Sequence, residues 1–377
     1  MSTCALYAHR LGDPAPTGIA RYAAEMVARL AGPGQPRRGV AYTAAASRER
    51  SAPREDGTTG ARVRRPPVPR AALHLAWSAA GRPTVDRWIG RPDLVHVLYP
   101  STPVPSRAPQ VVTIHDLMPL QHPDWFAYGE AWRFRRAIRW AADHAVRLVA
   151  NSAKTARELT DLVGVDPARI EVVHLGVADE FRAAPDPAAV AAACARHGLR
   201  PGTYLMTVGS VSRRKNLFPV IDALERLADR DLTLVSIGPD GDGADLVRAH
   251  VAAAGLGTRV RFLGWRPDAE ARDLLAGALA LVHPSVAEGF GLPPLEAMAL
   301  GVPALASRAG SLPEVCGDAA LLLDPHDPDA WAGGIDAVAD PARRGSLVAA
   351  GRTWSAGFTW EAHAAAVAAL HRTLLGA

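Results

Sequence analysis

A strand, a glycine-rich loop and a helix follow one another in residues 278–299, and this order limits the possible folds more than any other feature of the sequence. The apolar run Ala278–Val282 is typical of a buried strand because it has five uncharged, small or branched residues. Gly289 and Gly291 lie in the loop, and Pro293 suits the first turn of a helix, where an N–H group has no partner in any case. This order predicts a βα unit of a parallel α/β sheet.

The loop also has the chemistry of a binding site. Backbone N–H groups at a helix N-terminus attract anions and hydroxyl groups, and glycines let a ligand approach the main chain. Glu288 and Glu296 flank the glycines, so their carboxylates can reach two parts of one extended ligand. For either glutamate alone, a solvated loop position or a charge that stabilises the helix N-terminus is an equally good explanation.

The segment from Glu288 to Pro303, E-G-F-G-L-P-P-L-E-A-M-A-x-G-x-P, resembles the signature of the retaining nucleotide-sugar glycosyltransferases of family 4, which have the GT-B fold. In that family the first glutamate lies at the donor sugar and the second hydrogen-bonds the nucleotide ribose. The resemblance assigns the donor sugar to Glu288 and the ribose to Glu296. It also places the loop residues at the donor: Gly289, Phe290, Gly291 and Leu292.

A basic cluster follows the predicted strand Tyr204–Val208, at the start of the next helix. Arg214 and Lys215 belong to this cluster, and the chain has only two lysines in all. Guanidinium and ammonium groups beside a helix N-terminus suit a diphosphate, although a solvated run of charges is the plainer alternative. The resemblance to family 4 extends to this R-K-N stretch and makes both residues donor-binding and catalytic. Many members have arginine where this chain has Ser210, so we expect Arg214 to carry more of the charge.

His115 and Asp116 come directly after the predicted strand Gln110–Ile114. The carboxyl ends of strands in open α/β sheets are where ligands bind, although a histidine there can also simply satisfy its own turn. The stretch I-H-D-L-M-P-L resembles one in bacterial mannosyl- and rhamnosyl-type members of family 4, where the histidine lies between donor sugar and acceptor. The resemblance therefore assigns both His115 and Asp116 to the catalytic acceptor side.

Three further features follow from position and resemblance. Gly18 matches the family's glycine loop facing the donor phosphates, although Thr17 replaces a second glycine there. Trp265 lies where the family's base-binding loop lies, or is simply a packed aromatic residue. Asp240 and Asp242 imitate a metal-binding D-x-D motif but follow a Gly-Pro pair, so we interpret them as a turn and expect no metal site.

Strand and helix patterns alternate along both halves of the chain, which predicts two Rossmann-like domains with parallel sheets. The resemblance implies the GT-B architecture, with the sheets facing across a cleft. We expect an N-terminal acceptor-side domain (1–180), a donor-binding domain (181–357) and a terminal helix (358–377) that packs back on the first domain. Residues 32–70 show little pattern beyond a possible strand near 40–44 and are predicted to be mostly loop.

Composition argues against several classes of function. The 42 basic residues are dispersed and nearly balanced by 38 acidic ones, which argues against a nucleic-acid partner. No apolar run of about 18 residues or secretory leader is evident, and three scattered cysteines suggest neither disulfides nor zinc, so we expect a cytoplasmic enzyme with reduced thiols. Arginine clusters at 62–65 and 133–136 leave room for weak peripheral contact with anionic lipids.

These observations and the resemblance predict a metal-independent glycosyltransferase without a cofactor, and the resemblance implies retention at the anomeric carbon. The enzyme would move a hexose-type sugar from a UDP-, GDP- or TDP-linked donor to the hydroxyl of a small molecule or glycan, possibly a lipid-linked one. A nucleotide-sugar epimerase or phosphorylase on the same fold is one alternative, and a non-catalytic nucleotide-binding subunit is another. The base, sugar and acceptor stay open.

Overall fold

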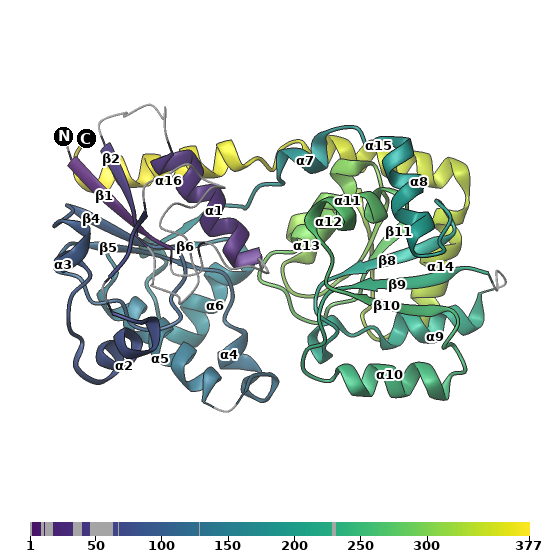
Figure 1. Ribbon diagram of the computed structural model, residues 1–377, viewed down its shortest axis with the longest axis horizontal. Helices are drawn as coiled ribbons and strands as arrows, with labels where there is room; N and C mark the ends of the chain where they lie inside the picture. Colours follow the sequence, from purple (N-terminus) through teal and green to yellow (C-terminus); the bar gives the residue numbers. More distant parts are fainter. Residues whose placement is uncertain are drawn as a thin grey trace. The chain divides into compact units, whose positions relative to one another are not determined.

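The computed structural model describes residues 2–8, 11, 18–32, 40–45, 63–66, 68–127, 129–227 and 231–377. The chain forms two compact units. Unit 1 contains Met1–Gly176 together with Trp360–Ala377, and unit 2 contains Val177–Thr359. Each unit has one sheet with helices on both of its faces (Figure 1). The two Rossmann-like domains predicted from the alternating pattern are therefore present.

Unit 1 has a parallel sheet of seven strands in the order β3-β2-β1-β4-β5-β6-β7. The chain adds β2 and β3 on one side of β1 and then turns to the other side with β4, so the strand order reverses beside β1. Every residue of β4 and β5 is buried, which explains why both are nearly continuous apolar runs. The strands are β1 (Ser2–Tyr7), β2 (Val40–Ala45), β3 (Val63–Arg64), β4 (Leu94–Val97), β5 (Gln110–Ile114), β6 (Arg147–Ala150) and β7 (Ile170–Val172).

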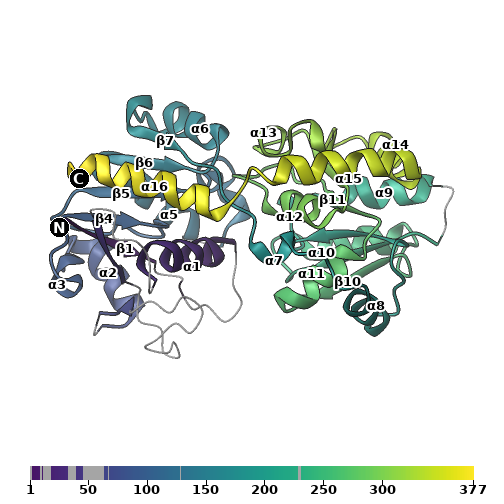
Figure 2. The ribbon, with the colours of Figure 1, turned by 90° about the horizontal axis from the view of Figure 1, so that it is seen from above.

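The helices of unit 1 include the C-terminal helix α16 (Trp360–Leu375), which runs beside α1 (Gly18–Ala31) in both views (Figures 1 and 2). Ser152 caps α6, because its hydroxyl accepts the amide of Thr155. The neighbouring Asn151 does not share in the cap, because its Oδ1 is buried and accepts no hydrogen bond from the described residues. The remaining helices are α2 (Arg70–Ala80), α3 (Asp86–Ile89), α4 (Met118–Gln121), α5 (Glu130–His144) and α6 (Ala153–Val163).

Unit 2 has a parallel sheet of six strands in the order β10-β9-β8-β11-β12-β13. The order reverses between β8 and β11, which is the point where open α/β sheets bind ligands. The strands are β8 (Tyr204–Val208), β9 (Thr233–Ile237), β10 (Val260–Gly264), β11 (Ala280–His283), β12 (Ala304–Ser307) and β13 (Leu321–Leu323). The helices are α7 (Asp179–Arg182), α8 (Pro187–Arg196), α9 (Phe218–Arg226), α10 (Ala244–Ala253), α11 (Asp268–Ala276), α12 (Leu292–Leu300), α13 (Leu312–Cys316), α14 (Pro328–Ala339) and α15 (Pro341–Ser355), with a 3-10 turn η3 (Arg213–Lys215).

The observed elements confirm one predicted feature of the stretch 32–70 and correct another. The strand predicted near 40–44 is confirmed as β2, but β3 also lies inside the stretch predicted to be mostly loop. Its two residues are too short to produce a periodic pattern. The turn before α1 and most of the predicted loop 32–70 lie outside the described residues. The three cysteines are buried and free. Among the described helices, none is long and apolar enough to cross a bilayer.

Candidate active site

The glycine loop and its helix occupy the predicted positions at the β11–α12 junction. β11 ends at His283, and α12 begins at Leu292 with Gly291 as its N-cap. Gly291 has φ = 112°, and a Cβ there would lie 2.6 Å from Leu312 Cδ2, so only glycine fits without strain. Phe290 is buried and packs edge-on against the ring of Phe358. The loop therefore has a defined shape before any ligand binds.

The basic cluster lies at the neighbouring β8–α9 junction, across the point where the strand order reverses. Gly209, directly after β8, has φ = 128°, and a Cβ there would lie 2.8 Å from Lys215 Cε. Asn216 adopts a left-handed conformation, and its side chain donates to the carbonyls of Pro284 (3.3 Å) and Pro325 (2.6 Å). The amide of Val286 donates to the carbonyl of Arg214 (3.0 Å). These contacts join the two loops that carry the candidate residues.

Glu288 binds both cations of the cluster. Its Oε2 lies 2.6 Å from Arg214 Nη1, and its Oε1 lies 2.7 Å from Lys215 Nζ. The side chains of Lys215 and Glu288 are only 8% and 10% exposed. Burial by itself raises the pKa of Glu288, but Arg214, Lys215 and His283 together outweigh this effect, so the pKa lies well below its ordinary value. Glu288 is therefore an ionised carboxylate at neutral pH.

Burial lowers the pKa of Lys215 to about 8, with the attraction of Glu288 opposing this change. His283 completes the cluster, with its Nε2 3.0 Å from Glu288 Oε1. Burial lowers the pKa of His283 to about 4, so the ring is neutral at pH 7. The hydrogen bonds assign the proton to Nε2, which donates to the carboxylate. The sequence analysis missed His283, although it is the last residue of the strand that leads into the glycine loop.

Gly310 and Ser311, which were not predicted from the sequence as site residues, hold the main chain of Glu288 in place. The amide of Ser311 donates to the carbonyl of Glu288 (3.2 Å), and its hydroxyl lies 2.6 Å from the carbonyl of Phe290. Gly310 has φ = 62°, and a Cβ there would lie 2.7 Å from the Glu288 nitrogen. The Gly-Ser pair after β12 was the available signal, because β12 pairs with β11 and its loop must lie beside the glycine loop.

The other predicted donor residues of unit 2 fall into three settings. Glu296 is buried in α12, and Gly289 is buried in the loop before Leu292. Trp265 follows β10 and is nearly half exposed, so it is not the packed aromatic residue that was the alternative. Their contacts with a nucleotide sugar stay predictions.

The Asp-Gly-Asp stretch is held by arginines. Asp240 pairs with Arg248 (2.8 Å) and Asp242 pairs with Arg213 (3.3 Å), just before α10. Arg213 therefore lies outside the Glu288 cluster, unlike its neighbours in sequence. The arrangement agrees with the interpretation of these residues as a turn before a helix.

In unit 1, His115 lies at the end of β5, almost fully buried. Its Nε2 donates to the carbonyl of Leu98 (3.1 Å), which leaves Nδ1 as a hydrogen-bond acceptor. The ring of Tyr22 packs against it edge-on, with 4.6 Å between the centroids. Burial lowers the pKa of His115 to about 4. At neutral pH the uncharged ring can therefore accept a hydrogen bond from a ligand hydroxyl through Nδ1.

The two remaining predicted residues of unit 1 have plainer surroundings. Asp116 accepts the amide of Met118 (3.1 Å) with its carboxylate, at the start of α4, and so has a structural role there. Gly18 is the exposed first residue of α1, and a Cβ there would meet no atom within 4 Å. Packing among the described residues therefore does not require glycine at position 18. The catalytic role of Asp116 and the phosphate contact of Gly18 stay predictions.

A chain of buried and half-buried polar side chains, which was not predicted from the sequence, runs through unit 1 close to His115. Tyr22 Oη lies 3.0 Å from Thr113 Oγ1, which lies 2.8 Å from His96 Nε2. His96 Nδ1 in turn lies 3.0 Å from His371 Nε2, and His371 Nδ1 lies 3.1 Å from Tyr42 Oη. Burial lowers the pKa of His371 to about 3, and that of His96 falls well below its usual value. The chain is uncharged, and it ties α16 to the sheet.

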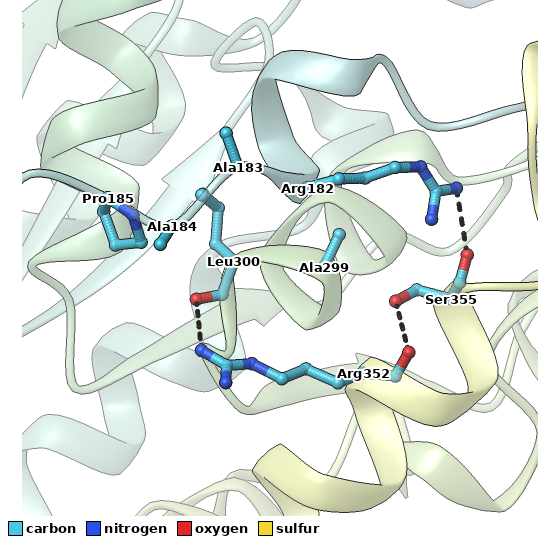
Figure 3. A pocket seen from close by; sticks show the side chains of 8 residues that line it. All are labelled: Arg182, Ala183, Ala184, Pro185, Ala299, Leu300, Arg352 and Ser355. Carbon is cyan, nitrogen blue, oxygen red and sulfur yellow. Dashed lines mark hydrogen bonds between the residues drawn. The ribbon is translucent and has the colours of Figure 1, made fainter.

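A cavity of about 260 Å³ in unit 2 is lined by Ala299 and Leu300, the last two residues of α12, among others (Figure 3). The glycine loop precedes the other end of this helix. Arg182 and Arg352 reach the rim of the cavity, where Arg182 donates to the carbonyl of Ser355 (3.1 Å) and Arg352 to that of Leu300 (3.5 Å). Its other lining is mostly small and apolar, and it includes none of the predicted site residues. The two guanidinium groups bind main-chain carbonyls at helix ends, which is a structural role.

Comparisons with known proteins agree with this geometry. The family model described as "Glycosyl transferases group 1" matches residues 197–354, and the one described as "Glycosyltransferase Family 4" matches residues 16–181. The O-antigen chain mannosyltransferase B of Escherichia coli is 29% identical over 364 residues, which cover 92% of this chain and 93% of that protein. The D-inositol 3-phosphate glycosyltransferase of Kribbella flavida is 34% identical over 243 residues, which cover 61% of this chain but only 57% of that protein.

Solved structures share the fold over nearly the whole chain. The Anabaena Alr3699/HepE structure with UDP and glucose has a TM-score of 0.76 and 18% identity, covering 99% of this chain and all of that one. The structure of WaaG, a glycosyltransferase of lipopolysaccharide biosynthesis, has a TM-score of 0.72 and 19% identity, covering 97% of this chain and 99% of that one. With two parallel sheets and both family models matched, the chain belongs to the GT-B glycosyltransferases of the family 4 type.

Proposed function

We propose that this glycosyltransferase moves a hexose-type sugar from a nucleotide diphosphate sugar to an acceptor hydroxyl, with retention at the anomeric carbon and without a divalent metal. The observation that carries the proposal is the pair Arg214 and Lys215 beside the N-terminus of α12, at the point where the strand order reverses. Two cations beside the positive end of a helix dipole can neutralise the charge that develops on a leaving diphosphate. A metal ion would then not be needed for that purpose.

The ionised state of Glu288 favours sugar transfer over glycoside hydrolysis, which uses a pair of carboxyl groups. A glycoside hydrolase needs a carboxylic acid with a raised pKa to protonate the leaving oxygen. Glu288 has a lowered pKa, and both of its oxygens are engaged by cations. We assign the acceptor proton to the leaving diphosphate, with Glu288 near the donor sugar and Glu296 at the ribose. On the acceptor side, His115 Nδ1 orients the acceptor hydroxyl.

The relatives suggest donors and acceptors to test first. HepE has been seen with UDP and with UDP-glucose, which supports a uridine nucleotide as donor here. The relatives include an O-antigen chain mannosyltransferase and D-inositol 3-phosphate glycosyltransferases, so a growing glycan and a phosphorylated polyol are both suitable test acceptors. The specificity of this chain is an open part of the proposal.

A thermal-shift screen against UDP, GDP, TDP and ADP sugars tests the donor, because a ligand of the native state raises the unfolding temperature with concentration. The best donor is then incubated with candidate acceptors in EDTA, and the anomeric configuration of the product is determined by NMR. We expect transfer with retention and no loss of rate in EDTA. Donor epimerisation or phosphorolysis without transfer would favour the first rival activity, and binding without turnover would favour a non-catalytic subunit.

We also propose weak contact with anionic membranes through one face of unit 1, formed by α2 and α5. Leu75 on α2 is 71% exposed and Trp132 on α5 is 58% exposed. Arg136 joins the two helices, because it donates to the carbonyl of Ser78 (2.6 Å). Arg135 and Arg139 are exposed on the same helix, and residues 131–142 contain no acidic side chain. Exposed apolar side chains among arginines suit an anionic lipid surface.

Co-sedimentation with vesicles tests this contact. We expect binding to vesicles of phosphatidylcholine with phosphatidylglycerol, weaker binding at high salt, and little binding to phosphatidylcholine alone. Leu75→Asp should reduce binding, whereas Leu246→Asp, at a half-exposed leucine on α10 of unit 2, should not. Equal loss with both variants, or binding that ignores lipid charge, would contradict the proposal.

A further inference from the structure

Lys215 is a buried cation with a single carboxylate partner. Its ammonium lies 2.7 Å from Glu288 Oε1 and 3.4 Å from His283 Nε2, and Arg214 is the other charge nearby. His283 is neutral at pH 7 and Arg214 repels a cation, so neither stabilises the ammonium. Within the described part of the chain, Glu288 is therefore the only carboxylate that forms an ion pair with Lys215.

The local fold keeps Lys215 in this buried position. Gly209 has no side chain, and the stem of Lys215 passes over it, because a Cβ at that position would lie 2.8 Å from Lys215 Cε. The left-handed conformation of Asn216 and its bonds to two carbonyls hold the end of η3 in place. A lysine in water stays protonated without help, but a buried lysine releases its proton far more easily.

We propose that Glu288 is the counter-ion that keeps Lys215 protonated, and that it acts on the donor diphosphate through Lys215. This inference rests on the proposed function, because it takes Arg214 and Lys215 as the diphosphate site. It gives Glu288 a role that is separate from any contact with the donor sugar. If Glu288 has this role, its replacement should change the binding of nucleoside diphosphates even when they carry no sugar.

The chemistry is an uptake of one proton. When Glu288 is replaced by glutamine, Lys215 loses its stabilising charge and is present as a neutral amine at a lower pH than in the wild type. A diphosphate prefers the ammonium, so its binding then draws one proton from the buffer to form R–NH₃⁺ from R–NH₂. No bond to the nucleotide forms or breaks in this step.

Isothermal titration calorimetry of UDP binding in buffers of different ionisation enthalpy measures this uptake. At pH 7.5 the wild type should take up about a quarter of a proton, because the pKa of Lys215 is about 8. Glu288→Gln should take up distinctly more, approaching one. Between pH 7.0 and 8.5, UDP affinity should fall about fourfold for the wild type and more than tenfold for Glu288→Gln.

Two variants identify the group that takes up the proton. Glu158→Gln makes the same chemical change at the carboxylate that pairs with the other lysine, Lys154 (2.6 Å), and it should keep the wild-type proton uptake. The double variant Lys215→Arg with Glu288→Gln carries a guanidinium that stays charged, so its UDP binding should lose the proton uptake. Uptake that persists in the double variant would assign the proton to His283 and overturn the inference.

Other outcomes separate this inference from the proposed function. Glu288→Gln with the UDP affinity and pH dependence of the wild type, but slower sugar transfer, would show that Glu288 contacts only the sugar. A wild-type protein that binds none of the nucleoside diphosphates would overturn the proposed function and the inference with it. If Glu288→Gln does not fold, Glu288→Asp withdraws the carboxylate by one methylene, and its proton uptake should exceed that of the wild type; an unchanged uptake would count against the inference.

Discussion

Both units bury polar side chains near the ends of their strands, but the cluster in unit 2 is charged and the one in unit 1 is neutral. In unit 2, Glu288 is held between Arg214 and Lys215. In unit 1, the chain from Tyr22 through His96 to His371 has hydroxyl and imidazole groups only, and burial keeps the histidines uncharged. A buried charge is tolerated only when an opposite charge lies beside it, and unit 2 provides that partner.

The difference suggests that the two units bind different parts of the substrates. A site that receives a diphosphate needs fixed positive charge, and the carboxylate of Glu288 holds that charge in place before the ligand arrives. The proposed acceptor site needs an uncharged hydrogen-bond acceptor, and Nδ1 of His115 has that property. The predictions below test this contrast, starting with the largest effect.

Acid should destabilise unit 1 more than unit 2, because four buried histidines of the described residues lie in unit 1 and one, His283, lies in unit 2. In the folded chain the pKa values of His115 and of His363 on α16 are about 4, whereas the ordinary value is 6.5. Below pH 6.5 the unfolded chain therefore binds protons at these residues that the folded chain does not bind. Stability is then complete above pH 6.5 and declines towards pH 4, by about 3 kcal/mol for each such histidine. Hydrogen exchange followed by mass spectrometry should show α16 and β1 losing protection first. Equal loss in both units would contradict the contrast.

Lys215→Ala should lower kcat by about 100-fold or more, because the charge on the leaving phosphate is greatest in the transition state. Steady-state kinetics with the donor identified in the screen measures the change. Lys154→Ala is the matched control: it removes the other lysine, which pairs with Glu158 one turn along α6, and it should change kcat by less than about twofold. A near-normal kcat in Lys215→Ala would remove Lys215 from the diphosphate site.

Glu296→Gln should weaken binding of the nucleoside diphosphate by about 1 to 3 kcal/mol, the scale of a hydrogen bond to a charged group. The effect should be the same for the nucleotide and for the nucleotide sugar, because both contain the ribose. Calorimetric titration of each ligand gives the comparison. Unchanged affinity for both in a folded variant would refute the ribose assignment.

His115→Ala should reduce sugar transfer about tenfold, the scale of one lost hydrogen bond, while nucleotide affinity stays close to that of the wild type. Because the pKa of His115 is about 4, wild-type transfer should show no titration of this residue between pH 5.5 and 8. Transfer rates and nucleotide titration on the same preparation separate the two effects. A variant whose only defect is lost nucleotide binding would place His115 at the donor.

Local sequence was sufficient for most of the elements and for the loops that carry the site. The strands 110–114 and 204–208 lie where their apolar runs predict, and the helix after Gly291 begins where glycine and two prolines indicate. The reason is that strand periodicity, helix capping and turn chemistry depend on residues that are neighbours in the chain. The same local information could not resolve β3, which has only two residues.

Tertiary structure alone decided which residues meet. Glu288 and Lys215 are 73 positions apart, and His96 and His371 are 275 apart, so neither pair leaves a trace in a local pattern. Their contacts follow from strand order, which places β8 beside β11, and from the packing of α16 beside α1. Burial then set the charge of each group, because the cost of a charge depends on what surrounds it in space and not on its neighbours in the sequence.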